Sequence, residues 1–341
     1  MSDSEYPQEL IDAIIEEVPH SARTTLAACA LTSSAFVASS QRRLFWGVSI
    51  ANVGAYKRAA ALLASSPHLG AYVRCLELNI AGLPKDCPQL KEILSRLPDV
   101  ERLVITGRPV AFHDQLGENP SLLDLIARSS VKALGLRNVS RIHPSVVLRA
   151  FSYMEQVSLY DVSIANADGN LGDVAPSAKV HHLRITGDEY SLVIPFISQP
   201  TLFTYLRHLT SISVLFPPIY DELKPGFNSL LTACSSTLKH LKLELEAPYD
   251  NLPALPGLSH LELWLDVDLL KTPVQLAAIV SRTAAATPHI HALTLAMMDR
   301  PKQAPQRQLA FPFSVAEWPA LDDAIMGLRD LREVEFSLRY F

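Results

Sequence analysis

Residues 238–243 read LKHLKL, and residues 258–263 read LSHLEL. Alternation in Leu-x-Leu points both leucines to one side of a strand and the residue between them to the other side. The same phrase, an apolar residue, two mostly polar residues and then Leu-x-Leu or a close variant, recurs along most of the chain. Internal similarity of this kind predicts a repeat architecture.

Ten copies of the phrase are present. The first apolar residue of each Leu-x-Leu variant falls at positions 76, 103, 134, 157, 183, 209, 241, 261, 293 and 334. Most of the intervals lie close to the roughly 20–29 residues of a leucine-rich repeat. Between the copies, apolar residues at helical spacing predict helices over residues 88–97, 121–129, 145–153, 228–234 and 273–283.

A strand and a returning helix cannot bury their apolar faces alone, so the copies are expected to stack. The predicted fold class is α/β: an irregular leucine-rich-repeat solenoid of about ten strand-helix units over residues 73–341, with a parallel inner sheet and outer helices. An ordinary doubly wound α/β domain is the alternative. It rarely reaches ten strands and needs helices on both faces of its sheet.

The charge balance of the chain gives no sign of a polyanionic partner. Among 341 residues, 30 are Lys or Arg and 35 are Asp or Glu, a net charge of -5. We therefore expect neither a nucleic-acid nor a membrane partner. No apolar run approaches the ~18 residues of a membrane span, and the polar, acidic N-terminus does not resemble a secretory signal. A cytoplasmic or nuclear location is expected.

Motifs that carry chemistry do not appear. The chain has no phosphate-binding, dinucleotide-binding, nucleophile-elbow or zinc-protease pattern. We therefore expect no catalytic residue, no metal and no cofactor, and hence a binding protein and not an enzyme. Reduced, partly buried thiols are the expectation for the cysteines, because none forms a C-x-x-C pair. The four cysteines are Cys29, Cys75, Cys87 and Cys234.

The N-terminal segment lacks the repeated phrase. Apolar residues at helical spacing predict three short helices, over residues 7–18, 24–31 and 33–46. Three such helices make only a small core, so an exposed apolar face on them would need a partner. We assign residues 1–50 to this helical module and residues 51–72 to a connecting helix.

The pattern of apolar and basic residues in this module has a counterpart in a known family. It rests on Pro7, Glu9, Leu10, Ile14, Ile15, Leu26, Cys29, Leu31, Phe36, Arg42, Arg43, Leu44 and Phe45. In these residues the segment resembles F-box-like proteins, the fungal, basidiomycete type in particular.

The resemblance implies a substrate receptor of a cullin-type ubiquitin ligase. The helices would dock on a Skp-family adaptor, and the repeats would bind an unknown protein substrate. A free-standing leucine-rich scaffold with no ligase role is the alternative. The family's adaptor contacts map to Pro7, Leu10, Ile14, Leu26, Leu31 and Phe36. Some of them could instead pack the helices together, Leu26 and Leu31 above all.

One column of the predicted sheet is rich in histidine. The residue before the first Leu of each phrase points away from the core, and His182, His208, His240 and His260 occupy it in four successive copies. Such close imidazoles would repel one another when protonated, which lowers their pKa values. Together with Arg184 and Lys242 they could form a strip that recognises a protein; solvated filler is the alternative.

Two aromatic residues lie one alternation further along the same face, Tyr160 and Trp264. Aromatic side chains exposed in a concave groove are typical of residues that dominate protein binding. A core role is the alternative for both.

Overall fold

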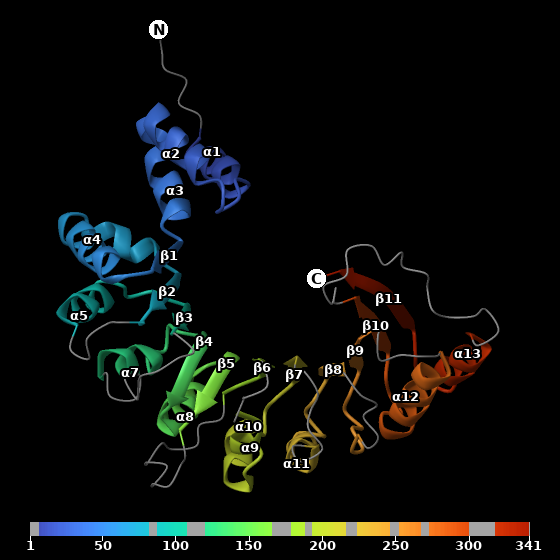
Figure 1. Ribbon diagram of the computed structural model, residues 1–341. Helices are drawn as coiled ribbons and strands as arrows, with labels where there is room; N and C mark the ends of the chain where they lie inside the picture. The colour runs from blue at the N-terminus through green and yellow to red at the C-terminus, as the bar shows by residue number, and fades with distance from the viewer. Residues whose placement is uncertain are drawn as a thin grey trace, which may run out of the picture.

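The structure is a computed structural model, and it describes residues 7–81, 87–107, 120–165, 179–187, 193–215, 224–245, 252–266, 273–299 and 318–340. Within these ranges the chain forms a curved solenoid with a helical module at its N-terminal end (Figure 1).

One sheet of eleven strands runs through the solenoid. The strands follow one another in chain order from β1 to β11, and every neighbouring pair is parallel. The strands are β1 Gly47–Ile50, β2 Cys75–Asn79, β3 Arg102–Thr106, β4 Ala133–Ile142, β5 Gln156–Ile164, β6 His182–Thr186, β7 Ser211–Leu215, β8 His240–Leu245, β9 His260–Asp266, β10 Ala292–Asp299 and β11 Glu333–Tyr340.

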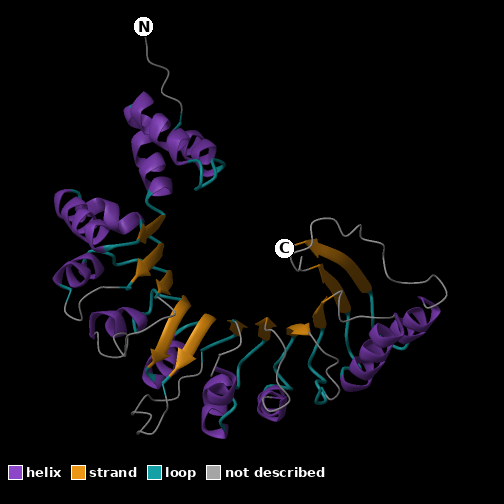
Figure 2. Ribbon diagram, in the orientation of Figure 1, coloured by secondary structure: helices purple, strands orange, loops and turns teal. Residues whose placement is uncertain are grey.

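The helices of the solenoid lie on the outer side of this sheet and the strands line its concave side (Figure 2). The helices are α1 Gln8–Glu16, α2 Arg23–Thr32, α3 Ser34–Leu44, α4 Val53–Ser65, α5 Pro88–Ser95, α7 Pro120–Ile126, α8 Pro144–Tyr153, α9 Val193–Ile197, α10 Phe203–Leu206, α11 Lys224–Ala233, α12 Pro273–Ala286 and α13 Trp318–Met326, with the 3-10 turns η1 Pro67–Tyr72 and η2 Pro200–Leu202. The predicted α/β class, parallel inner sheet and outer helices are confirmed, and the doubly wound alternative is wrong.

The two apolar residues of each phrase build a continuous core. Leu76 and Leu78 of β2 are fully buried, whereas Glu77 between them is half-buried on the other face. The same alternation repeats along the sheet, and one apolar cluster runs from Ile50 to Leu328. Each repeat therefore completes the core of its neighbour, as expected of a solenoid.

A ladder of shared carbonyls fixes how successive repeats align. The carbonyl of the residue two positions before each Leu-x-Leu accepts hydrogen bonds from two consecutive N–H groups of the next repeat, at 2.8–3.1 Å. The ten acceptors are Trp46, Arg74, Glu101, Lys132, Glu155, His181, Thr210, Lys239, Ser259 and His291. This ladder assigns every repeat its register.

The ladder corrects the predicted position of one strand. His208 was expected in the outward column, but Thr210 supplies the shared carbonyl and Ser211 pairs with His182 on one side and with His240 on the other. The Leu-x-Leu of this repeat is therefore residues 212–214, and Leu209 is its leading buried residue. The first apolar positions 183, 212 and 241 are then evenly spaced by 29 residues.

The sheet also begins earlier than predicted. Residues 45–50, FWGVSI, carry an eleventh copy of the phrase, and β1 pairs in register with β2. Helix α4 packs on β1 and α5, so it is the outer helix of the first repeat. The solenoid thus starts at Gly47 and not at residue 73.

Candidate functional site

The N-terminal module is built around its third helix. Both α1 and α2 pack on α3, and the module buries Ile11 and Ile15 of α1 together with Leu26 of α2. The three predicted helices are confirmed. Because they are short, they bury only a small shared core.

The module exposes apolar side chains on its outer surface. Leu31 at the end of α2 is 88% exposed, and Leu10 and Ile14, one turn apart on α1, are 48% and 53% exposed. Of the other predicted contact residues, Pro7 is exposed and Phe36 is half-buried. Leu26 is 0% exposed, so its prediction as a contact residue is wrong and it belongs to the core.

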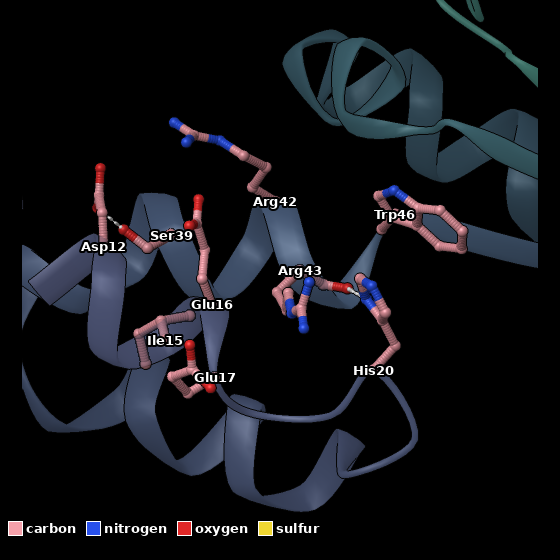
Figure 3. A pocket seen from close by; sticks show the side chains of 9 residues that line it. All are labelled: Asp12, Ile15, Glu16, Glu17, His20, Ser39, Arg42, Arg43 and Trp46. Atoms are coloured by element: carbon pink, nitrogen blue, oxygen red, sulfur yellow. Dashed lines mark hydrogen bonds between the residues drawn. The ribbon is translucent and has the colours of Figure 1, made fainter.

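A pocket of about 390 Å³ opens between α1 and α3 (Figure 3). In this region the Asp12 carboxylate accepts hydrogen bonds from the Ser39 hydroxyl and from the Gln8 side-chain amide. Both bonds lower the pKa of Asp12, and the bond from Ser39 has the larger effect. Arg43 donates to the Val18 carbonyl at 3.0 Å. The contacts join the first and third helices, which is a structural role.

The loop after α1 is tied to the start of the solenoid. The His20 ring stacks on Trp46 with centroids 4.5 Å apart, and His20 Nδ1 lies 3.3 Å from the Arg43 carbonyl oxygen (Figure 3). Because Trp46 also provides the first shared carbonyl of the ladder, the module is anchored directly to β2. These interactions fix the base of the module to the first repeat.

The histidine column of the concave face holds three of the four predicted members. His182, His240 and His260 are exposed at equivalent positions of β6, β8 and β9, with Ser211 between the first two. His208 lies in the turn before β7, where its carbonyl faces His181 Nδ1 at 3.1 Å. The strip is therefore interrupted at β7.

The two adjacent imidazoles of the strip are in contact. The rings of His240 and His260 have centroids 4.4 Å apart at an interplanar angle of 32°. Burial lowers the pKa of His240, and the neighbouring charges of His260 and His182 lower it further. The predicted direction of the shift is confirmed for His240.

Beside this pair lies a compact polar cluster. Lys242 Nζ is 2.7 Å from Glu262 Oε1 and 3.9 Å from the centroid of the Trp264 ring, and Trp264 Nε1 donates to the same carboxylate oxygen. Trp264 is half-buried. Lys242 is thus neutralised by its neighbour on β9, so the cluster presents an indole and not a free cation.

A second feature of the concave face lies nearer the N-terminal end. A depression of about 530 Å³ spans β2 to β6 and is lined by Glu77, Thr106, Arg137, Ser158, Tyr160, Arg184 and Thr186 among others. Tyr160 is 46% exposed, so its alternative core role is excluded. We call this depression the Arg137–Arg184 groove.

Sequence reasoning singled out Tyr160 and Arg184 but missed Arg137 and Thr106. Arg137, Tyr160 and Thr186 are register partners on β4, β5 and β6. Reading the column one alternation beyond Leu-x-Leu across all copies would have found them, because parallel strands place equivalent residues side by side.

The described residues contain no group of three or more His, Cys, Asp or Glu side chains that could hold a metal ion. Within the same ranges, no helix has the length and apolar character needed to cross a membrane. All four cysteines are free; Cys87 and Cys234 are buried, and burial raises the pKa of the Cys234 thiol to about 12.

Comparisons with known proteins do not place the chain in a family. No protein-family model matches the chain, and no curated protein matches it. Among solved structures, the chain is similar to one in the crystal structure of the Rad7 and Elc1 complex in yeast, with 14% identity, a TM-score of 0.30, and coverage of 90% of this chain and 97% of that one. A likeness at this level establishes neither a shared family nor a shared function.

Proposed function

We propose that this protein is a substrate receptor of the F-box type, with no reaction of its own. The N-terminal helices dock on a Skp-family adaptor of a cullin-type ubiquitin ligase, and the concave strand face binds a protein substrate. The proposal rests on the division of the chain into a small helical module and a long solenoid with an open inner face (Figure 1).

The observation that carries the adaptor half is the exposure of Leu31, Leu10 and Ile14. Large apolar side chains exposed on a small module favour a protein partner, because burying each of them on binding removes apolar surface from water. The residues expected as adaptor contacts from the F-box resemblance include these three.

The substrate half is supported by the concave face. Its histidines, the Trp264 cluster and Tyr160 give an amphipathic, partly aromatic surface of the kind that dominates protein interfaces. Its open curvature suits an extended or helical segment of another protein.

Co-expression of the full chain with a Skp-family adaptor tests the adaptor half. The wild-type chain is expected to co-purify with the adaptor, whereas Leu31→Asp is expected to lose it. Met326→Asp is the matched control, because Met326 of α13 is 82% exposed yet belongs to the far end of the chain. Failure of the folded wild-type chain to bind would leave a free-standing repeat scaffold.

A further inference from the structure

The charges of the concave face are segregated along the solenoid. At the strand positions of β2 to β7 whose side chains point to the concave side, there are three guanidinium groups and one carboxylate. The guanidinium groups belong to Arg102, Arg137 and Arg184, and the carboxylate to Glu77. In the same positions of β8 to β11 the balance reverses, with the single ammonium of Lys242 against the carboxylates of Glu262, Glu333 and Glu335. Glu244 occupies such a position as well but is buried. Among the described strands, the N-terminal half of the concave face is therefore the part that attracts an anion.

Two of the guanidinium groups line the Arg137–Arg184 groove, one from β4 and one from β6. Both side chains are exposed, and neither forms a hydrogen bond or an ion pair with any other residue in the part of the chain that the structure describes. Most of their donors are thus available to a ligand. Lys242, by contrast, is already paired with Glu262.

The floor and walls of the groove add neutral polar groups. Ser158, Thr186 and the exposed phenol of Tyr160 line it beside the two arginines. Thr106 Oγ1 is buried and has no hydrogen-bond partner among the described residues. A buried hydroxyl without a partner is costly in an isolated protein, so a ligand atom at this place would relieve the cost.

The backbone next to the groove is unusual as well. Within the described residues, the non-glycine residues with positive φ are Asn138 (52°), Arg141 (55°) and Asp161 (48°), all on β4 or β5. Asn138 lines the groove, and a Cβ at Gly107 would lie 2.7 Å from its carbonyl oxygen. Such uncommon conformations gather at binding sites.

We propose that the Arg137–Arg184 groove binds an anionic side chain of an extended peptide, either a carboxylate or a phosphate ester. Arginine suits this role because its planar, permanently charged fork donates two hydrogen bonds to such an anion. The inference rests on the proposed function, for which it names the substrate class: a segment with its acidic residues over β3 to β6.

Fluorescence anisotropy with the full chain tests the inference. The probes are three labelled Gly-Ser peptides of equal length, one with a central run of glutamates, one with glutamines in their place and one with phosphoserines. We expect the glutamine peptide to bind about tenfold more weakly than an anionic one, since charge-assisted bonds are lost. If both anionic peptides bind, the groove accepts either source; if one binds, that one is the source.

The variants are Arg137→Gln and Arg184→Gln, with Arg149→Gln on outer helix α8 as the control of equal charge change. The first two are expected to weaken binding of the anionic peptide about tenfold, and the control to leave it unchanged. Equal losses in all three variants, equal binding of the glutamine peptide, or no binding of either anionic peptide would overturn the inference.

Adaptor binding separates the two proposals. Arg137→Gln is expected to co-purify with the Skp-family adaptor as the wild-type chain does. Loss of peptide binding with the adaptor retained would confirm that the groove acts apart from the module. If the chain binds the anionic peptide but does not bind the adaptor, the proposed function is refuted and the anion site in the groove is retained.

Discussion

Two leucines of the same helix are expected to respond in opposite ways to the same truncation. Leu26 is 0% exposed and Leu31 is 88% exposed, although both belong to α2. Leu26→Ala leaves a cavity in a small core, and buried Leu→Ala changes cost about 2–5 kcal/mol. Leu31→Ala removes side-chain atoms that already face solvent, so its effect on the free energy of unfolding is within about 0.5 kcal/mol.

The two substitutions are expected to rank the other way round in their direct effect on adaptor affinity. Burying a leucine side chain on binding contributes about 1.5–3 kcal/mol, so Leu31→Ala is expected to weaken the adaptor complex roughly ten- to hundredfold. Leu26→Ala reduces binding only through its effect on folding. Loss of binding without loss of stability is therefore the signature of a contact residue.

Chemical denaturation of the full chain measures the stability change, and isothermal titration calorimetry with a Skp-family adaptor measures the affinity. The unfolding of the module must be followed by a local probe, because the solenoid can unfold separately. The fluorescence of Trp46, which stacks on His20 at the base of the module, serves this purpose in a background where Trp264 and Trp318 of the solenoid are replaced by Phe. If Leu31→Ala binds the adaptor as tightly as the wild-type chain, then Leu31 is not an adaptor contact.

Further predictions concern the solenoid. A Cβ at Gly70 would clash with the Arg96 carbonyl, whereas one at Gly54 in α4 would meet only ordinary contacts. Thermal unfolding should therefore show that Gly70→Ala destabilises the folded chain by about 1–3 kcal/mol and that Gly54→Ala stabilises it by about 0.5–1 kcal/mol. Equal effects of the two substitutions would contradict this packing. Since the pKa of His240 is lowered in the folded state, the unfolded chain binds more protons below about pH 6.5, and stability should fall as the pH drops through that value. His240→Gln should reduce this loss between pH 7.5 and pH 5.5, and an unchanged slope would count against the shift. Cys234, with its raised pKa and burial, should resist iodoacetamide until the chain unfolds, and rapid labelling in the native state would contradict its placement.

Much of the sheet could be predicted because a parallel stack enforces alternation in every repeat. The frame failed at one place, where Leu206, Leu209 and Ile212 follow at intervals of three residues and the frame was set three residues too early. The alternation Ile212-Ser213-Val214 already favours the later frame, and the backbone ladder, with its acceptor at Thr210, confirms it. The first strand was missed because residues 45–50 follow α3 without an intervening loop.

Individual contacts were harder to predict than strands. Leu26 and Leu31 are five residues apart, which on an α-helix separates their directions by roughly 140°, so one can be core while the other faces solvent. Which of the two is buried depends on how α2 packs on α3. Lys242 and Glu262 are register partners, but their pairing could be predicted only after the two repeats had been aligned.

We propose that the helical module, and not the concave face, holds the adaptor. Hydrogen–deuterium exchange of the full chain, alone and with a saturating Skp-family adaptor, can locate the contact. We expect slower exchange in α1 to α3 and unchanged exchange in β3 to β9. Unchanged exchange throughout α1 to α3, or protection confined to the strands of the concave face, would contradict the proposal.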